Sequence, residues 1–409
     1  MMQNYFQAKP PSDTRVEARQ PSSGGALLFF IENGSLCLAK EVFHPVKGWQ
    51  GHDLSKARLR HDMPGAHCSS FASALSVPTP GRTQAIHLAM VASDARGDHL
   101  YLSLSNRAAD MAADSAQGVA PAWIACPFDA GAPPPRLAIT QVQIGDASDR
   151  PFVVVDVLID PDGAQPRRAR YSIDIGRGGR PGMDPRWIEH RLSIDSGAGV
   201  HASCLGRCRG GWDVDGLYLA GTVGGEAQLL YAPLYNPFNP LQPRWARHLE
   251  IPGKLAVGAM AACRNADNTS DLYAVAGDTL YYFSASNQNE GAQALALGSS
   301  AAFAGMCSLF ATATGGRVML WGLNGAGQVV CTGAPQVYVA DPAAWSEPGV
   351  ILSDVEAITP SPDGDGVDYA FFARMGGSLV KVTREPGTML WTGYSIDNFS
   401  GNSGDPKRD

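Results

Sequence analysis

The sequence predicts an all-β protein, specifically a seven-bladed β-propeller built from four-stranded antiparallel blades. Of its 409 residues, 44% are hydrophobic and only 17% are charged, and long Glu/Lys-rich helical windows are absent. The 46 glycines and 29 prolines suit many tight turns. The same pattern of short strands also recurs along the chain, and a closed repeat architecture of this length forms one unit. We therefore expect a propeller over residues 25–396, with flexible tails over residues 1–24 and 397–409.

The clearest copy of the repeat runs from Ala357 to Ile396. A small-residue segment leads into an Asp/Gly turn and then into the apolar run Tyr369–Ala373. Gly376-Gly377 predicts a hairpin turn, and Trp391 opens the last strand. Four short strands joined by tight turns form a sheet of about 40–50 residues, which is the size of a propeller blade.

Two sequence markers count the blades. The first is a large residue in the second strand, expected at Tyr101, Phe152, Tyr218, Tyr273, Met319 and Tyr369, with residues 26–30 as an earlier copy. The second is a tryptophan at the last strand, found at Trp49, Trp123, Trp187, Trp245, Trp345 and Trp391. The gap between Trp245 and Trp345 spans two periods, and residues 293–297 fill the vacant place. Both markers indicate seven blades.

Turn residues and irregular segments refine this prediction. Hairpin turns are expected at Asn33-Gly34, Gly224-Gly225, Gly277-Asp278, Asn324-Gly325 and Gly376-Gly377. An insertion over residues 108–120 has the composition of a short helix. The first blade has no obvious first strand: either residues 14–19 supply it, or the ring closes by strand exchange between the chain ends.

Charge and hydropathy exclude several classes of partner. The net charge of −7 argues against nucleic acid, because phosphate binding needs a basic surface. The basic stretch from Arg167 to Arg191 is interrupted by Gly, Pro and Asp, so a solvated loop is favoured over an anion site. The sequence shows neither a signal peptide nor an apolar run long enough to span a membrane. We expect a soluble protein that is cytoplasmic or exported by a non-classical route.

No motif indicates a metal, a cofactor or a catalytic centre. The eight cysteines are interpreted as reduced structural thiols, four of them in the small-residue segments that open repeats. The turn with Asp363, Asp365 and Asp368 resembles half of a calcium loop, but Asp94, Asp213 and Asp267 fill the same slot, which favours Asx-turns. A nucleophile elbow and an HExxH motif are both missing. Catalytic residues are therefore unknown, and whether the protein is an enzyme stays open.

The repeated tryptophans are the candidate ligand-binding residues. An aromatic face binds the C–H face of a sugar, while polar neighbours fix its hydroxyl groups. The alternative is that each tryptophan packs as a wedge between blades, since large aromatic residues dominate cores. The candidate site residues are Trp49, Trp123, Trp187, Trp245, Trp345 and Trp391.

The repeat resembles the tectonin-like lectins and the bacterial seven-bladed fucose-binding lectins. Residues 367–379 with Trp391, and residues 271–280, match the aromatic-rich strand, the turn and the Trp-bearing strand of those blades. The resemblance implies a multivalent glycan binder whose weak sites gain strength by avidity.

The leading hypothesis is a carbohydrate-binding, lectin-like propeller with repeated sites between blades. One alternative is a protein-interaction scaffold that holds its partner with the irregular loops 105–122 and 165–186. Another is a propeller hydrolase or lyase with a site at the central channel. The expected partner is a glycan or glycoconjugate, with a protein partner as the alternative.

Overall fold

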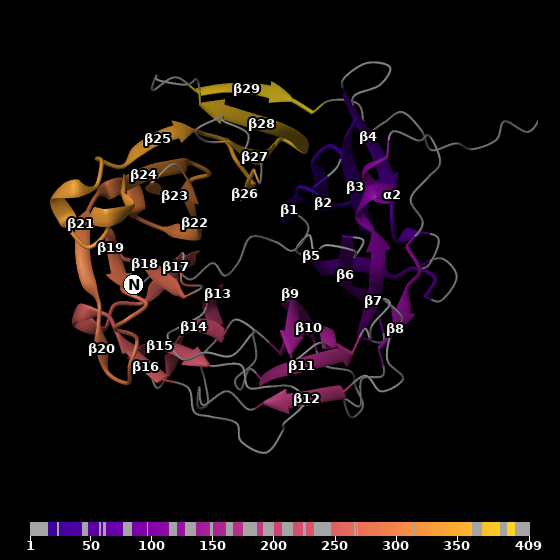
Figure 1. Cartoon of the computed structure of the whole chain (residues 1–409), viewed down its shortest axis with the longest axis horizontal. Coiled ribbons are helices and arrows are strands. Elements are labelled where there is room, and N and C mark those ends of the chain that lie inside the picture. Colours follow the sequence, from indigo (N-terminus) through magenta and orange to yellow (C-terminus); the bar gives the residue numbers. More distant parts are fainter. Residues whose placement is uncertain are drawn as a thin grey trace, which may run out of the picture. The chain divides into compact units, whose positions relative to one another are not determined.

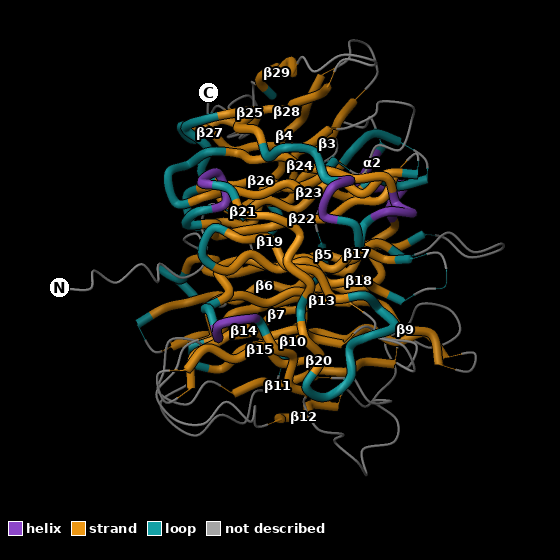
Figure 2. Tube along the Cα trace, turned by 90° about the vertical axis from the view of Figure 1, so that its left-hand side faces the viewer, coloured by secondary structure: helices purple, strands orange, loops and turns teal. Residues whose placement is uncertain are grey.

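The computed structural model describes the strands and some of the connections that join them. The described residues are 15–22, 24–42, 48–56, 59, 63–76, 84–95, 97–113, 121–126, 136–147, 150–160, 167–174, 186–190, 200–206, 216–223, 226–232, 247–265, 267, 269–314, 316–361, 370–384 and 391–396. Strands dominate this part of the chain (Figure 2). The prediction of a mostly β protein with four-stranded antiparallel sheets is confirmed.

The chain divides into two compact units, whose strands are labelled in Figure 1. The terminal unit contains β1–β8 and β26–β29, so it unites both ends of the strand order. The central unit contains β9–β25. The described strands form seven sheets, in which neighbouring strands follow one another in the sequence apart from one added strand, β20.

The terminal unit holds three sheets. The first consists of β1 (Val16–Arg19), β2 (Leu27–Glu32), β3 (Ser35–Val42) and β4 (Gly48–Asp53). The second consists of β5 (His67–Leu75), β6 (Ala85–Asp94), β7 (Gly97–Arg107) and β8 (Ile124–Ala125), with helix α2 (Ala108–Ala112) after β7. The last consists of β26 (Ala357–Pro360), β27 (Ala370–Met375), β28 (Ser378–Arg384) and β29 (Trp391–Ser395).

The central unit holds four sheets. The third consists of β9 (Leu137–Ala147), β10 (Arg150–Ile159), β11 (Arg167–Asp174) and β12 (Arg186–His190). The fourth consists of β13 (Val200–Gly206), β14 (Gly216–Val223), β15 (Glu226–Ala232) and β16 (Arg247–Glu250), with β20 (Ala292–Gln293) added parallel to β16. The fifth consists of β17 (Val257–Arg264), β18 (Ser270–Ala276), β19 (Thr279–Phe283) and β21 (Leu295–Ser299). The sixth consists of β22 (Met306–Thr314), β23 (Arg317–Asn324), β24 (Val329–Pro335) and β25 (Gly349–Leu352).

Short 3₁₀ helices occupy several connections of the central unit. They are η2 (Pro252–Lys254), η3 (Ala301–Phe303), η4 (Gln336–Tyr338) and η5 (Pro342–Ala344). Both η3 and η5 begin with a side-chain cap: Ser300 accepts from the Ala302 amide, and Asp341 accepts from the Ala343 amide. Such caps satisfy backbone donors that the helix itself leaves open.

Sheets are buried on both faces where neighbours stack on them. On β2, Phe29 belongs to an apolar cluster shared with the second sheet, whereas Phe30 belongs to one shared with the last sheet. On β18, Leu272 packs in a cluster with fourth-sheet residues and Tyr273 in a cluster with sixth-sheet residues. Burial on both faces explains why these strands read as continuous apolar runs rather than alternating ones.

Small residues open the repeats because the first strands of neighbouring sheets approach closely. A Cβ atom on Gly258 in β17 would lie 2.5 Å from the carbonyl oxygen of Met306, where β22 begins. A Cβ atom on Gly206 in β13 would lie 2.6 Å from the Cβ of Ala262 in β17. Neither position has room for a side chain.

The N-terminal strand resolves one alternative that the sequence left open. β1 lies within residues 14–19 and pairs with β2, so the chain itself supplies the first strand of the first sheet. This strand lies inside the segment expected as an N-terminal tail. The fourth strand expected at residues 293–297 is also found, since β21 completes the fifth sheet without a tryptophan.

Three local predictions need correction. Tyr101 lies on β7, the third strand of its sheet, because the turn at Asp94 joins the second and third strands; β6 holds the second-strand place. The basic stretch expected as a loop contains two paired strands, β11 and β12. Asn324-Gly325 opens a longer turn in which Gly327 has the positive φ.

Two other hairpins have the predicted turn conformation. Asn33 and Gly34 have φ of 48° and 73°, and Gly376 and Gly377 have φ of 54° and 80°. Positive φ at both turn positions matches the right-handed twist of the flanking strands. Gly277, with φ of 64°, turns between β18 and β19, whereas Gly224-Gly225 lies outside the described residues.

Candidate functional site

The structure describes the side chains of four of the six candidate tryptophans. Trp49 lies on β4 and Trp391 opens β29, whereas Trp123 and Trp345 lie in the connections that lead into β8 and β25. Each of the four therefore occurs on, or just before, the fourth strand of its sheet. Trp187 lies on β12, but the structure does not describe its side chain. Trp245 lies outside the described residues.

Trp123 and Trp49 pack between sheets. Only 7% of Trp123 is exposed, and its Nε1 donates a 2.8 Å hydrogen bond to the carbonyl of Leu54 at the end of the first sheet. Trp49 is half-buried and meets Phe372 of the last sheet edge-on, with 5.9 Å between ring centroids. Such burial leaves little of the Trp123 ring for a ligand, whereas Trp49 keeps part of its surface.

Trp345 is half-buried, and ring packing and a hydrogen bond hold its indole in place. Its ring lies 5.7 Å from that of Tyr273 at an interplanar angle of 65°, and it packs against the cluster between the fifth and sixth sheets. Its Nε1 donates a 3.0 Å hydrogen bond to the carbonyl of Val339. This bond fixes the connection that carries η4 and η5 relative to the indole.

Two exposed hydrophobic side chains lie on η4, directly before Val339, whose carbonyl accepts the Trp345 hydrogen bond. Val337 is 82% exposed and Tyr338 is 59% exposed, both on η4. The connection is braced further by backbone bonds from Asp341 N to the Tyr338 carbonyl and from Ser346 N to the Gly333 carbonyl, both 2.9 Å. Tyr338 therefore presents its ring from a rigid segment, and we call Val337, Tyr338 and Trp345 the η4 platform.

Trp391 has similar surroundings on the last sheet. It is half-buried, with its ring 6.0 Å from that of Phe371, and the following residues of β29 are exposed. Tyr394 on this strand is 44% exposed. The last sheet thus also presents a tryptophan and an exposed tyrosine on its outermost strand.

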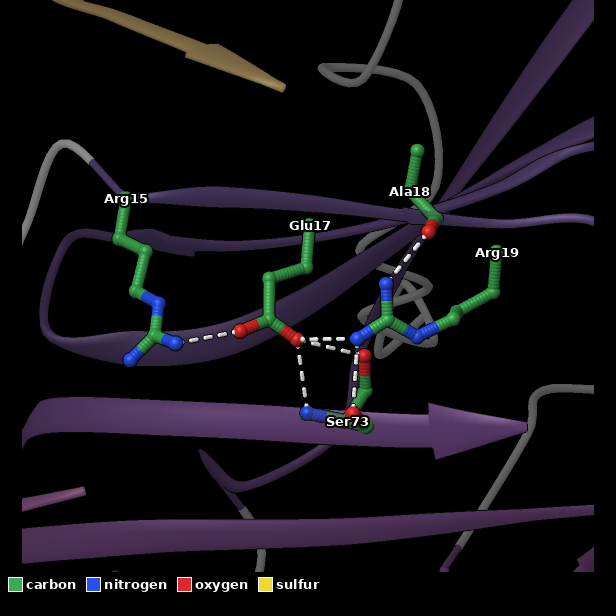
Figure 3. A network of polar contacts seen from close by, with 5 residues as sticks. All are labelled: Arg15, Glu17, Ala18, Arg19 and Ser73. Carbon is green, nitrogen blue, oxygen red and sulfur yellow. Dashed lines mark hydrogen bonds and ion pairs between the residues drawn. The ribbon is translucent and has the colours of Figure 1, made fainter. Parts of the chain in front are cut away.

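A polar network that the sequence did not indicate lies on β1 and β5 (Figure 3). The carboxylate of Glu17 is 2.6 Å from Arg15 and 3.0 Å from Arg19, and it accepts 2.7 Å hydrogen bonds from both the amide and the hydroxyl of Ser73. Burial alone raises the pKa of Glu17, but the two arginines and Ser73 outweigh it, so the pKa is lowered. Alternating charged residues on a short strand carry no motif that would have revealed this network.

Two buried polar side chains, Asp271 and Tyr273, lie on β18, and Trp345 packs against the Tyr273 ring. The carboxylate of Asp271 accepts a 2.8 Å hydrogen bond from the Ala285 amide. The hydroxyl of Tyr273 is buried and has no hydrogen-bond partner among the described residues. Burial, followed by the nearby Asp271, raises the pKa of Tyr273, so its phenol stays protonated.

The aspartate turns behave as Asx-turns where they are described. Asp94 accepts a hydrogen bond from the Gly97 amide at 3.2 Å, and Asp267 accepts from the amide and hydroxyl of Thr269 at 3.1 and 2.6 Å. The turns with Asp213 and with Asp363 to Asp368 lie outside the described residues. Within the described part of the chain, no group of three His, Cys, Asp or Glu side chains could hold a metal ion.

Two of the described cysteines, Cys68 and Cys263, are buried. Burial raises the pKa of Cys37 and of Cys68 to about 12 and that of Cys263 to about 11. Thiols with such pKa values are poor nucleophiles at neutral pH.

The described helices include none long and apolar enough to cross a membrane.

Comparison with known proteins gives similarity only at the level of solved structures. No family model and no curated protein sequence matches the chain. The six-bladed fungal lectin of Aleuria aurantia, described with a fucose recognition mode, is 13% identical with a TM-score of 0.41, covering 96% of this chain and 100% of the lectin. The WD40 domain of SCAP from fission yeast is 10% identical with a TM-score of 0.47, covering 94% of this chain and 91% of that domain.

A glycan-processing enzyme is also among the similar structures. The α-L-arabinanase of Penicillium chrysogenum, in complex with arabinobiose, is 11% identical with a TM-score of 0.46, covering 78% of this chain and 91% of the enzyme. At identities and TM-scores this low, neither blade number nor ligand nor activity transfers from one protein to another.

Proposed function

We propose that the chain is a seven-bladed β-propeller that binds carbohydrate at aromatic surfaces on, or just before, the fourth strands of its sheets. The η4 platform is the observation that carries this proposal. Tyr338 is 59% exposed on a turn whose backbone is hydrogen-bonded, and the half-buried Trp345 donates its Nε1 to the carbonyl of the next residue, Val339. A rigid aromatic face can stack on the C–H face of a sugar with little loss of conformational entropy.

Polar groups suited to sugar hydroxyls lie on the same connection. Asp341, between η4 and η5, is exposed, and its Oδ1 accepts the Ala343 amide at the start of η5. The Tyr338 hydroxyl adds both a donor and an acceptor. Aromatic side chains together with a few polar groups that fix orientation are a common composition of small-molecule binding sites.

A second site is proposed at Trp391 on the last sheet. Tyr394 lies three residues further along the regularly paired strand β29 and so faces the other side, which leaves Trp391 as the aromatic group of this site. Two or more weak sites on one molecule bind a multivalent glycan surface more tightly than either site alone. Because Trp123 is buried between sheets, we expect fewer binding sites than tryptophans.

A glycan array with labelled protein tests the proposal. Folded wild-type protein is expected to bind one coherent sugar family. Changing Tyr338→Ser should lower binding by about fivefold, since an aromatic contact contributes on the order of 1 kcal/mol. Trp391→Ala should lower it separately.

The matched control is Leu255→Ser, which removes another apolar side chain of the same unit, 43% exposed, and should leave binding unchanged. A blank array from folded wild-type protein would contradict the proposal. Equal binding by wild type and both aromatic variants would do the same.

A further inference from the structure

The two faces of β1 contact different sheets. Its alternate residues Val16 and Ala18 are 4% and 5% exposed and belong to the apolar cluster that includes Ala357 and Phe372 of the last sheet. Glu17, between them, points instead toward Ser73 on β5 of the second sheet (Figure 3). Because side chains alternate along a strand, one four-residue strand reaches both neighbours of its own sheet.

The side chains of β1 complete the open edge of the second sheet. β5 is the edge strand of that sheet, so its outward backbone groups have no partner strand. Glu17 accepts the Ser73 N–H at 2.7 Å, and Arg19 donates to the Ser73 carbonyl at 2.7 Å. Both backbone groups of one edge residue are thus bonded by side chains where a neighbouring strand would otherwise pair.

The charges around Glu17 are arranged to hold the carboxylate in place. Arg15, just before β1, and Arg19, at its end, flank the carboxylate, and the Arg15 guanidinium also lies 5.4 Å from the centre of the Phe71 ring on β5. β26 has no ionisable side chain, and on β27 Arg374 donates to the Ile31 carbonyl of β2 at 2.9 Å. Removing the carboxylate charge therefore leaves two adjacent guanidinium groups without their shared anion.

We propose that β1 is a strap that couples the first, second and last sheets, and that releasing Glu17 from Ser73 lets these three sheets open together. The strap acts in the terminal unit and includes none of the residues of the η4 platform. Strands of the first, second and last sheets should therefore open as one cooperative unit, although the first and last sheets come from opposite ends of the sequence.

Hydrogen exchange of the full-length protein at pH 7, read by mass spectrometry, tests the strap. In Glu17→Gln we expect exchange to become about tenfold faster or more in β1, β5, β26 and β27 together, with β17–β19 of the central unit unchanged. The control is Glu226→Gln, which breaks the exposed ion pair with Lys254 and should change none of these strands.

A milder variant protects the test against misfolding. Ser73→Ala removes only the hydroxyl bond to Glu17, so the same strands should accelerate by a smaller factor, a few fold. Faster exchange in β1 alone, in all sheets equally, or in none would overturn the proposal. If Glu17→Gln does not fold, the Ser73→Ala pattern decides by the same criteria.

Discussion

The indole of Trp49 meets the ring of Phe372 edge-on, with 5.9 Å between the centroids and 85° between the planes. Trp49 lies on β4 of the first sheet and Phe372 on β27 of the last sheet, so sheets from opposite ends of the sequence share an apolar layer. The first and last sheets each consist of consecutive strands. In the described residues, side chains rather than an exchanged strand join them.

Trp49→Ala should destabilise the protein by about 2–3 kcal/mol, because it removes a large half-buried ring from this layer. Urea denaturation followed by circular dichroism measures the loss. Trp49→Phe keeps an aromatic edge against Phe372 and should cost about 1 kcal/mol. Equal stability of wild type and Trp49→Ala would show that the contact contributes nothing.

Gly258→Ala should destabilise by about 1–3 kcal/mol, since the new Cβ would lie 2.5 Å from the Met306 carbonyl oxygen and the strands would have to move apart. Gly298→Ala is the matched control in the same fifth sheet. Its Cβ would meet no atom within 4 Å, so stability should stay within about 0.5 kcal/mol of wild type. Thermal denaturation of the two variants gives the comparison, and similar melting temperatures would contradict the close approach of β17 and β22.

His87 on β6 should make stability fall as the pH is lowered from about 6.5 to about 4. Burial lowers the pKa of His87 from 6.5 to about 4. Across that window the unfolded chain takes up a proton that the folded chain does not, so protons favour unfolding. Replacing His87→Gln should flatten this slope, measured as unfolding free energy against pH. Replacing the exposed His67→Gln should leave the slope intact, and an unchanged slope in His87→Gln would refute the assignment.

Glu17 should govern a second, more acidic part of the same profile. Its pKa is lowered in the folded state, so its stabilisation is complete above the unfolded value near 4.5 and is lost as the pH falls through the folded value. Glu17→Gln should cost about 2 kcal/mol at pH 7 and progressively less below pH 4.5. A constant difference from wild type between pH 7 and pH 3 would show that the carboxylate charge is irrelevant.

Local sequence signals were sufficient for the strands and most turns. Asn33-Gly34 predicted its hairpin because few other residue pairs adopt two positive φ angles, and the apolar runs at β2 and β18 predicted strands. The error at Tyr101 arose because an Asp-rich turn opens the second strand in some copies of the repeat and the third strand at Asp94. A turn motif specifies a reversal of the chain but not which pair of strands it joins.

The candidate site could be predicted only in part. The repeat predicts a tryptophan near the fourth strand of every sheet but the fifth. Burial distinguishes Trp123, which is 7% exposed and bonded to Leu54, from Trp345, which is half-buried. That distinction depends on the path of the following connection, which the repeat does not specify. Glu17 and Ser73 come together only through packing between sheets, so no spacing in the sequence could reveal their contact.

A glycan array probed with folded wild-type protein and with the Tyr338→Ser variant tests the carbohydrate-binding account most directly. The account predicts that wild-type protein binds a coherent family of sugars and that the variant binds the same family about fivefold more weakly. A blank array from wild-type protein of native stability would contradict carbohydrate binding. It would then favour a protein partner for the exposed Val337 and Tyr338.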